Sequence, residues 1–299
     1  MNYKKLFTLI CFFYVSYGYS QNSFLEYSDT INKPRVIGVS SSQISLVGLS
    51  SVGLYSFWYS KESMSEFHLF NDWNNWSNMD KAGHIYSAYH LSKISSNLFS
   101  WAGVNKKKSV LLGSSIGLGF QSMIEIMDGF SSKWGFSYSD MGANIIGTSL
   151  YAGQELFFNK QILIPKFSYH NTPYSELRPQ VLGRNQIEKI LKDYNGQSYW
   201  ISFSPKSFLN SISIPEWLCF SFGYSIDQRI YGDQNSVVFQ NQEYISNKEF
   251  LFSLDIDLSK IKCKNAFFKT ILNQLNYLKI PFPTVSFSSN KLTFHPLYF

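Results

Sequence analysis

The sequence has few charged residues for its length. Only 15% of its 299 residues are Asp, Glu, Lys or Arg, whereas a typical soluble domain contains about 25%. This shortage predicts that part of the surface faces something other than water. The 27 Phe and 20 Tyr residues are typical of membrane-facing or sheet-rich surfaces.

The net charge of +6 does not come from a basic stripe. Lysines and arginines are scattered along the chain, and residues 106–108 form the one tight run. A nucleic-acid groove would need clustered basic side chains interleaved with exposed aromatic residues. We therefore expect no nucleic-acid partner, and we interpret the run as charge that flanks a helix at a membrane surface or in a loop.

Familiar catalytic and cofactor motifs are also scarce. The chain contains no GxGxxG, GxxxxGK[ST] or HExxH sequence. It contains three cysteines, and no CxxC or Cys/His cluster indicates zinc. Cys219 and Cys263 are predicted either to form a disulfide, which an exported protein would permit, or to remain two separate buried thiols.

The first twenty residues have the parts of a secretory signal. Lys4 and Lys5 give a positive start, and the apolar stretch that follows is too short to span a bilayer. Gly18 and Ser20 are the small residues that a signal peptidase requires. We therefore predict a signal peptide at residues 1–20 and a cell-envelope location. A retained N-terminal helix is the alternative.

Apolar helices are predicted for the first part of the mature chain. Apolar stretches and helical periodicity indicate four helices, at about residues 36–60, 80–99, 109–124 and 141–154. The first is long enough to span a bilayer, and the last two are short for a full span. Embedding in a membrane and burial in a large soluble core are the two open interpretations.

The pattern changes near residue 160. Apolar and polar residues then alternate, which predicts half-buried strands, and a surface helix is expected at residues 185–194. The fold class is therefore α+β, with a helical domain at 21–160 and a strand-rich region at 161–299. The four or five strands counted are too few for an outer-membrane barrel, which needs at least eight. A small sheet packed against the helices is expected instead.

Three of the predicted helices carry polar residues beside their apolar runs. Residues one or two turns apart lie on one face of a helix, so each helix presents one polar stripe. The stripes are Asp80, Lys81 and His84, then Gln121, Glu125 and Asp128, then Asp140, Asn144 and Gly147. An isolated carboxylate in a protein core or in lipid is strongly disfavoured. The three stripes are therefore predicted to meet.

The expected cluster suits two kinds of chemistry. Its members are Asp80, His84, Glu125, Asp128 and Asp140, with Lys81 or Lys133 as the balancing cation. Carboxylates and imidazole are suitable metal ligands, so the five residues are predicted to bind a divalent cation. Alternatively, His84 acts as a general base in catalysis with Asp80 and Glu125. Gln121 and Asn144 complete the polar site beside Lys81.

Structural roles are the competing interpretation. Asp80 and Asp140 each suit the N-cap of a helix, and Glu125 with Asp128 suits a helix end at a membrane surface. His84 suits an ordinary hydrogen-bonded interior histidine. Gly147 is predicted to permit close helix packing rather than ligand contact.

The order of these motifs resembles two families. The segment Asp80-Lys81-Ala82-Gly83-His84, then Glu125 with Asp128, then Asp140 with Gly147 is similar to VanZ-like membrane proteins. The similarity is closer to the YfiM-like family of predicted envelope lipoproteins, which share a domain of unknown function. This resemblance covers about Asp72–Phe158 and implies an envelope location without an established reaction. VanZ-like proteins have Arg where this chain offers Lys133, and the lipoprotein cysteine is missing.

Three hypotheses for function follow. The first is an exported envelope protein whose polar site binds a cation in a structural or binding role. The second is a membrane-proximal hydrolase or transferase that acts on lipid or cell-wall precursors. The third is an outer-membrane-associated assembly component that uses the C-terminal strands. Membrane or envelope components are the expected partners, and the sequence does not predict the oligomeric state.

Overall fold

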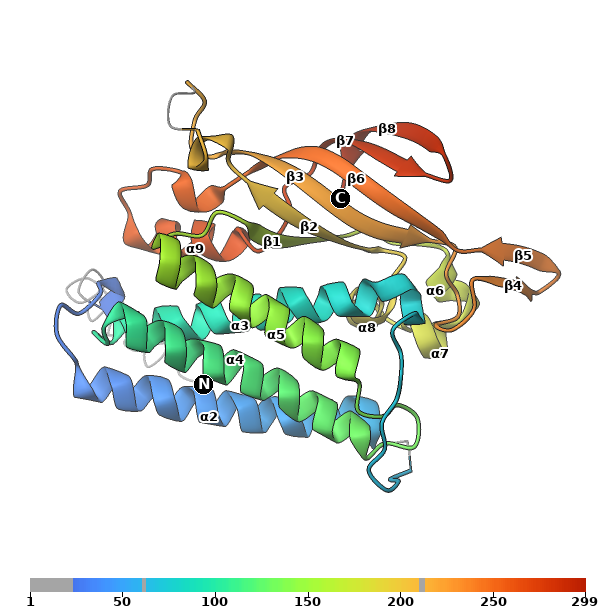
Figure 1. Ribbon diagram of the computed structural model, residues 1–299, viewed down its shortest axis with the longest axis horizontal. Coiled ribbons are helices and arrows are strands. Elements are labelled where there is room, and N and C mark those ends of the chain that lie inside the picture. Colours follow the sequence, from blue (N-terminus) through green and yellow to red (C-terminus); the bar gives the residue numbers. More distant parts are fainter. Residues whose placement is uncertain (1–23, 61–62, 210–212) are drawn as a thin grey trace, which may run out of the picture.

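A layer of helices lies against one face of an antiparallel sheet (Figure 1). The computed structural model describes residues 24–60, 63–209 and 213–299. The predicted signal peptide at residues 1–20 lies outside the described residues. The predicted α+β class is confirmed, because helices occupy the first part of the described chain and strands dominate the second.

Four long helices build the first layer. They are α2 (Lys33–Leu54), α3 (Met79–Trp101), α4 (Lys106–Gly129) and α5 (Tyr138–Gly153). Three begin at a residue whose side chain accepts a backbone N–H of the first turn: Asn32, Asn105 and Ser137. Short π-helical turns, Tyr55–Tyr59 and Gln154–Phe158, extend α2 and α5.

Small residues let these helices approach closely. Gly113 and Gly117 of α4 lie against Ser92 and Ser96 of α3, where a Cβ on either glycine would collide. A Cβ at Gly147 would likewise collide with the backbone carbonyl of Ile85. α3 thus packs tightly between α4 and α5, and Gly147 has the packing role that its spacing predicts.

The sheet has six strands in the order β1-β2-β3-β6-β7-β8, and all neighbours are antiparallel. The strands are β1 (Ile164–Tyr169), β2 (Gln197–Phe203), β3 (Leu218–Asp227), β6 (Asn247–Ile256), β7 (Phe282–Ser288) and β8 (Lys291–Tyr298). A separate hairpin joins β4 (Ser236–Phe239) to β5 (Gln242–Ile245). The sheet is therefore larger than the four or five strands expected.

Short helices connect the strands. They are α6 (Tyr174–Leu177), α7 (Pro179–Leu182), α8 (Gln186–Lys192) and α9 (Ala266–Leu275), with 3-10 turns at Asn75–Asn78, Pro205–Ser207 and Leu258–Lys260. The predicted surface helix is α8, and the side chain of Asn185 caps it by accepting the N–H of Glu188. Of the two predicted states of Cys219 and Cys263, the structure has the separate thiols rather than the disulfide; Cys219 is buried and Cys263 is partly exposed.

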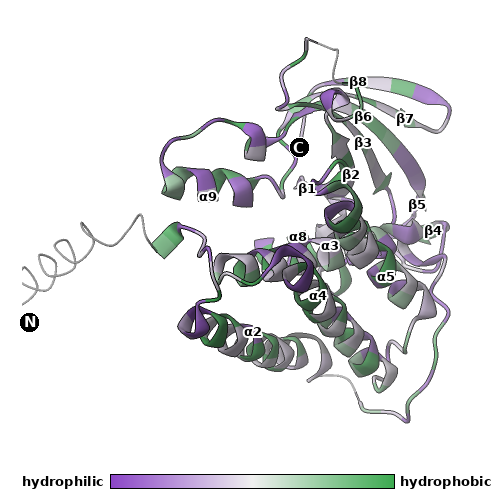
Figure 2. Ribbon diagram, turned by 60° about the vertical axis from the view of Figure 1, so that its left-hand side comes forward, coloured by the Kyte–Doolittle hydropathy of each residue, from purple (hydrophilic) through white to green (hydrophobic). Residues whose placement is uncertain are grey.

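Among the residues that the structure describes, two helices are long and apolar enough to cross a membrane, namely α2 and α4. Only 11% of the apolar window of α2 is buried inside the protein, against 33% for α4. α2 lies at the edge of the bundle, and apolar residues run along it (Figure 2). Its exposure contradicts burial in a soluble core for this helix.

Candidate functional site

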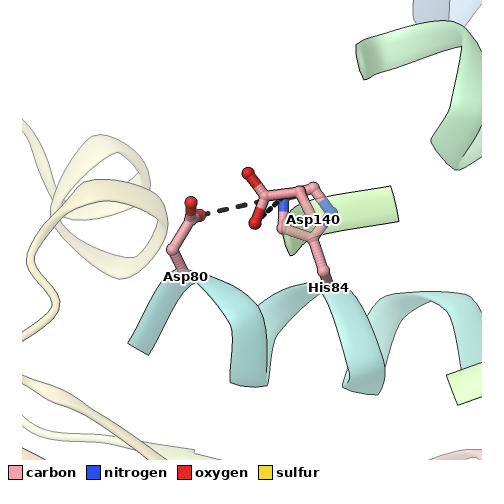
Figure 3. A group of neighbouring side chains, drawn as sticks. All are labelled: Asp80, His84 and Asp140. Atoms are coloured by element: carbon pink, nitrogen blue, oxygen red, sulfur yellow. Dashed lines mark ion pairs between the residues drawn. The ribbon is translucent and has the colours of Figure 1, made fainter. Parts of the chain in front are cut away.

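The polar stripes of α3, α4 and α5 converge. Asp80 and His84 are one turn apart on α3, and Asp140 reaches them from the first turn of α5 (Figure 3). Glu125 approaches from α4 and is only 1% exposed. The sequence thus predicts the meeting of these residues, because each stripe follows from helical spacing and α3 packs against both other helices.

His84 Nε2 lies among three carboxylates. It is 3.6 Å from Glu125 Oε1, 3.8 Å from Asp80 Oδ1 and 3.9 Å from Asp140 Oδ1. Asp80, His84 and Asp140 can each direct one ligand atom to a common point, with these atoms within 4.8 Å of one another. An imidazole nitrogen surrounded by carboxylate oxygens is an arrangement that suits a cation.

The other ring nitrogen of His84 is held by an amide. Nδ1 lies 3.0 Å from Asn144 Oδ1, which also accepts a hydrogen bond from Gln121 Nε2 at 3.2 Å. An amide oxygen accepts, so Nδ1 carries the proton and donates it. Nε2 is thereby directed at the carboxylates. Asn144 and Gln121, both predicted as members of the polar site, position the imidazole.

Lys81 is the cation that balances part of the negative charge. Its Nζ lies 2.7 Å from Asp72 Oδ2, 2.8 Å from Asp140 Oδ1 and 3.5 Å from Asp80 Oδ2. The alternative cation, Lys133, instead lies over the ring of Trp134, 4.8 Å from its centroid. Of the two predicted cations, Lys81 therefore forms the ion pairs of the cluster.

Asp72 belongs to the cluster, although the sequence does not indicate it. It accepts hydrogen bonds from Ser137 Oγ and Ser139 Oγ, both at 2.6 Å, besides its ion pair with Lys81. It precedes α3 in an irregular segment, so no helical spacing connects it to the stripes. Tertiary packing alone brings it to the first turn of α5.

Two tyrosines from outside the three helices complete the site. Tyr59 donates to Asp128 Oδ1 at 2.6 Å, and Tyr194, which follows α8, donates to Asp80 Oδ1 at 2.8 Å. Neither contact has a local sequence signal, because the partners are 69 and 114 residues apart. The second half of the chain therefore contributes directly to a site that the first half mostly builds.

The capping roles considered for the two aspartates are wrong. Asn78 is the N-cap residue of α3, and Ser137 caps α5 by accepting the N–H of Asp140. Asp80 and Asp140 instead lie in the first turns of their helices, where a negative charge interacts favourably with the helix dipole. Their side chains are left available to the cluster.

The chain enters α3 through an unusual turn. Trp76, Ser77 and Asn78 have φ angles of 50°, 52° and 68°, in the left-handed region that costs non-glycine residues about 1 kcal/mol each. The turn is held by Trp76 N–H donating to Gly232 O at 2.7 Å and by Tyr224 O–H donating to Ser77 O at 2.5 Å. The sheet half thus fixes the start of the helix that carries Asp80.

The buried acids hold their protons unusually strongly. Burial raises the pKa of Glu125 to about 8, with a contribution from the charge of Asp140. Burial and the charge of Asp80 raise the pKa of Asp140 to about 7. Burial lowers the pKa of His84, but the surrounding carboxylates outweigh it and raise that pKa above its usual value. At neutral pH the cluster therefore retains protons or requires another cation.

The buried polar atoms are not all satisfied. Glu125 Oε1 and Asn144 Nδ2 have no hydrogen-bond partner among the described residues. A buried group left unpaired costs about 1–3 kcal/mol. Glu125 Oε1 is also the closest carboxylate oxygen to His84 Nε2. Among the described residues, the cluster is therefore not a closed hydrogen-bonded network.

A cavity of about 490 Å³ opens onto the cluster. Asp80, His84, Asp128 and Asp140 line its polar side. The remaining wall is mostly aromatic and is formed by both halves of the chain: Tyr59, Phe70, Trp76, Tyr86, Trp134, Phe167, Tyr194 and Tyr199. The cluster is therefore accessible to a small molecule or to part of a larger one.

One serine fits a catalytic motif by sequence alone. Gly113 to Gly117 match the pattern GxSxG, with Ser115 in the nucleophile position. The segment lies inside α4, and the hydroxyl of Ser115 donates to Leu111 O. A nucleophile elbow requires a sharp turn between a strand and a helix, so this serine does not have that role.

Comparison with known proteins supports an envelope location. Residues 69–154 match the family model described as "Predicted periplasmic lipoprotein (DUF2279)". No curated protein and no solved structure matches the chain. The match includes every carboxylate of the cluster, from Asp72 to Asp140, and covers less than a third of the chain. It agrees with the expected resemblance to uncharacterised envelope lipoproteins and does not support the VanZ-like one.

Proposed function

We propose that this exported envelope protein binds a divalent transition-metal ion through His84, Asp80, Glu125 and Asp140. The observation that carries the proposal is the position of His84 Nε2, which faces three carboxylate oxygens at 3.6–3.9 Å. Zinc binds nitrogen and oxygen ligands at about 2.0–2.2 Å, so tetrahedral ligand atoms lie roughly 3.4 Å apart. Small side-chain shifts would complete such a sphere.

The charge of the cluster supports a cation. Five carboxylates, those of Asp72, Asp80, Glu125, Asp128 and Asp140, lie together, and Lys81 and His84 are the cations of their ion pairs in the described chain. With His84 neutral, as a metal ligand must be, full ionisation of the carboxylates would leave an excess of four negative charges over Lys81. A divalent ion offsets half of this excess, whereas without one the acids keep protons.

The ligand types favour a particular class of ion. Carboxylates alone suit Mg²⁺ or Ca²⁺, while imidazole favours zinc, iron and similar metals. The Asn144 amide that orients His84 is the kind of outer partner that metal-binding histidines have. We therefore expect Zn²⁺ or Mn²⁺ to bind more tightly than Mg²⁺. Asp128, which Tyr59 engages, would act from outside the coordination sphere.

A hydrolase or transferase is the second candidate. The aromatic cavity beside the cluster supports it, because this space would hold an amphipathic substrate against the metal. A bound metal would supply a polarised carbonyl or phosphoryl oxygen or an activated water. Without a metal, His84 would act as the base beside Asp80 and Glu125. Lipid and cell-wall precursors are the substrates to test.

Membrane association is part of the proposal. The exposed, apolar α2 supports contact with a bilayer. An exported protein anchored in this way would hold its cavity close to the membrane. The substrates of the second candidate are located there.

The test is metal binding by the purified chain after chelation. Isothermal titration with Zn²⁺, Mn²⁺ and Mg²⁺, followed by metal analysis, should show one ion per chain for Zn²⁺ or Mn²⁺. His84→Gln and Asp140→Asn should each weaken binding at least about tenfold, since each removes one ligand. Glu243→Gln, on the exposed β4–β5 hairpin, is the matched control.

Two results would contradict the proposal. One is the absence of binding by the folded wild-type protein for all three ions. The other is equal affinity in His84→Gln and in the control. Thermal unfolding of each variant, measured alongside, shows whether a loss of binding reflects a loss of fold.

A further inference from the structure

The sheet has its apolar face outward. In the register of the strands, Phe222 pairs with Phe252, Phe252 with Val285, and Val285 with Phe294. These four side chains form one row across β3, β6, β7 and β8, and their exposed fractions are 54%, 43%, 38% and 64%. A parallel row joins Phe250, Phe287 and Leu292, which are also exposed. The outer face is therefore a continuous apolar surface.

The other face of the same strands is buried and mostly polar, apart from a small apolar cluster of Trp200, Leu251 and Tyr298. On this face Ser221 pairs with Ser253, and both are buried. Lys166 and Asp255 form an ion pair of 2.7 Å, and neither side chain is exposed. Water-soluble sheets place serine and lysine outside and phenylalanine inside. The reversed order is typical of strands whose outer face contacts lipid.

A second exposed apolar surface lies on the amphipathic helix at one end of the sheet (Figure 1). α9 lies between the end of β6 and the start of β7, and its apolar side chains are exposed: Phe267 59%, Phe268 57%, Ile271 37% and Leu275 46%. No residue of α9 is buried. A helix with a strong apolar face that covers no core is typical of an interfacial membrane helix.

Lysines accompany this helix. Lys260, Lys262 and Lys264 precede α9 and are exposed, while Lys269 ties the helix to the loop by donating to the carbonyls of Ser259 and Ile261. The acid of this loop, Asp257, is buried and accepts from Asn276. The surface around α9 is therefore positive, and anionic headgroups complement it.

We propose that the outer face of the sheet and α9 together dock on a bilayer containing anionic phospholipid. The apolar rows and the phenylalanines of α9 would contact the acyl region, and the three lysines would lie at the headgroups. A second copy on the same face would bring its own lysines against these, so the charge favours lipid. In strand register the row through Phe250 continues through Tyr224 to Tyr199, which contacts Tyr86 of α3, so the helices cover this face of the sheet at β1 and β2 and leave it exposed at β6, β7 and β8. The inference does not depend on the cation site.

The test uses Cys263 as a reporter beside α9. It is partly exposed, whereas Cys219 is only 1% exposed, so a thiol-reactive fluorophore would label Cys263 selectively in the chain without residues 1–20, which contain Cys11. The labelled chain is mixed with phosphatidylcholine vesicles that contain either no or 30 mol% phosphatidylglycerol. A blue shift of the probe with the anionic vesicles, weakened by salt, is the expected result. α2 lies on the far side of the helical layer from the sheet (Figure 1), so one flat bilayer cannot cover both surfaces, and contact through α2 would leave the probe unshifted.

Variants separate the apolar and the charged contributions. Phe267→Ser with Phe268→Ser should abolish the blue shift without loss of folding, since both side chains are exposed. Lys260→Gln, Lys262→Gln and Lys264→Gln together should weaken binding to anionic vesicles on the order of a hundredfold. Val238→Ser, at an exposed site on β4, and Lys189→Gln, at a half-buried site on α8, are the matched controls.

Three outcomes would overturn the inference. The first is an unshifted probe with both vesicle types. The second is an equal shift in the α9 variants and the controls. The third is a stable dimer in light scattering that the phenylalanine variants dissociate, because it would assign the surface to a second copy.

Discussion

Two buried polar clusters lie on opposite sides of the boundary between helices and sheet, and they differ in completeness. In the sheet, Asp255 accepts from Ser202 at 2.7 Å and pairs with Lys166. Lys279 donates to the carbonyls of Leu254 and Ile280. In the helical cluster, carboxylates outnumber cations, and Glu125 Oε1 has no hydrogen-bond partner within the described part of the chain. A buried polar network stabilises the fold only when each of its polar atoms has a partner. The fully paired cluster in the sheet therefore has a structural role, whereas the partly paired helical cluster suits a binding site.

The largest effect should come from breaking the complete cluster. Asp255→Ala removes the partner of Lys166, whose side chain has no exposure. Loss of one partner of a buried ion pair costs about 3–5 kcal/mol. Urea unfolding should show this loss, with Asp233→Ala, an exposed position, as the control. Added Zn²⁺ should not restore the stability, whereas unchanged stability would contradict the structural role.

The pH dependence of the metal-free protein should reveal the incomplete cluster. The pKa values of Glu125 and Asp140 are raised to about 8 and about 7. Each of these carboxyl groups binds its proton more tightly in the folded chain than in the unfolded chain. The free energy of unfolding therefore falls as the pH rises from about 4, the ordinary pKa of a carboxyl group, to about 8. The melting temperature should therefore fall between pH 5 and pH 8, by about 2–4 °C per kcal/mol for a chain of about this size. Saturating Zn²⁺ should reduce the fall, and a flat profile without metal would contradict the charge excess.

Replacing Glu125 should affect binding more than folding. Glu125→Gln preserves the shape, and the raised pKa means that the native side chain is largely protonated at pH 7. We expect a stability change within about 1 kcal/mol and a tenfold or greater loss of Zn²⁺ affinity, because an amide is a poor metal ligand beside a carboxylate. Calorimetric titration and urea unfolding measure the two quantities. A large loss of stability with unchanged affinity would assign Glu125 to the scaffold.

The smallest effect concerns the contact between the halves. Tyr194→Phe removes the hydroxyl that donates to Asp80 Oδ1 and leaves the ring in place. The expected cost is about 1 kcal/mol or less in stability and a severalfold loss of metal affinity. Tyr199→Phe, whose hydroxyl instead donates to Gln197, is the control. Equal affinities of the two variants would show that the second half does not tune the site.

The sequence predicts the helical site better than the sheet, for a physical reason. Helical spacing defines which residues share a face, so the meeting of Asp80, His84, Glu125 and Asp140 follows from three apolar helices that must bury their charges. Asp72 and Tyr194 could not be predicted, because long-range packing alone brings them to the cluster.

Strand periodicity carries less information than helical spacing does. Alternation separates Phe222 from Ser221, but it does not say which of them faces the core. The composition does indicate an apolar surface, since low charge and many aromatic residues predict that part of the protein faces something other than water. The sequence does not predict β1, because Pro165 and Lys166 interrupt its apolar pattern. β4 and β5 are only four residues long each.

The central claim is that His84 and its carboxylates bind a metal ion, and X-ray absorption spectroscopy of the Zn²⁺-loaded protein tests it most directly. The account predicts one imidazole and two or three oxygen ligands at about 2.0–2.2 Å, with the imidazole signal lost in His84→Gln. A spectrum with oxygen scatterers alone, unchanged in that variant, would place the ion elsewhere and contradict the account.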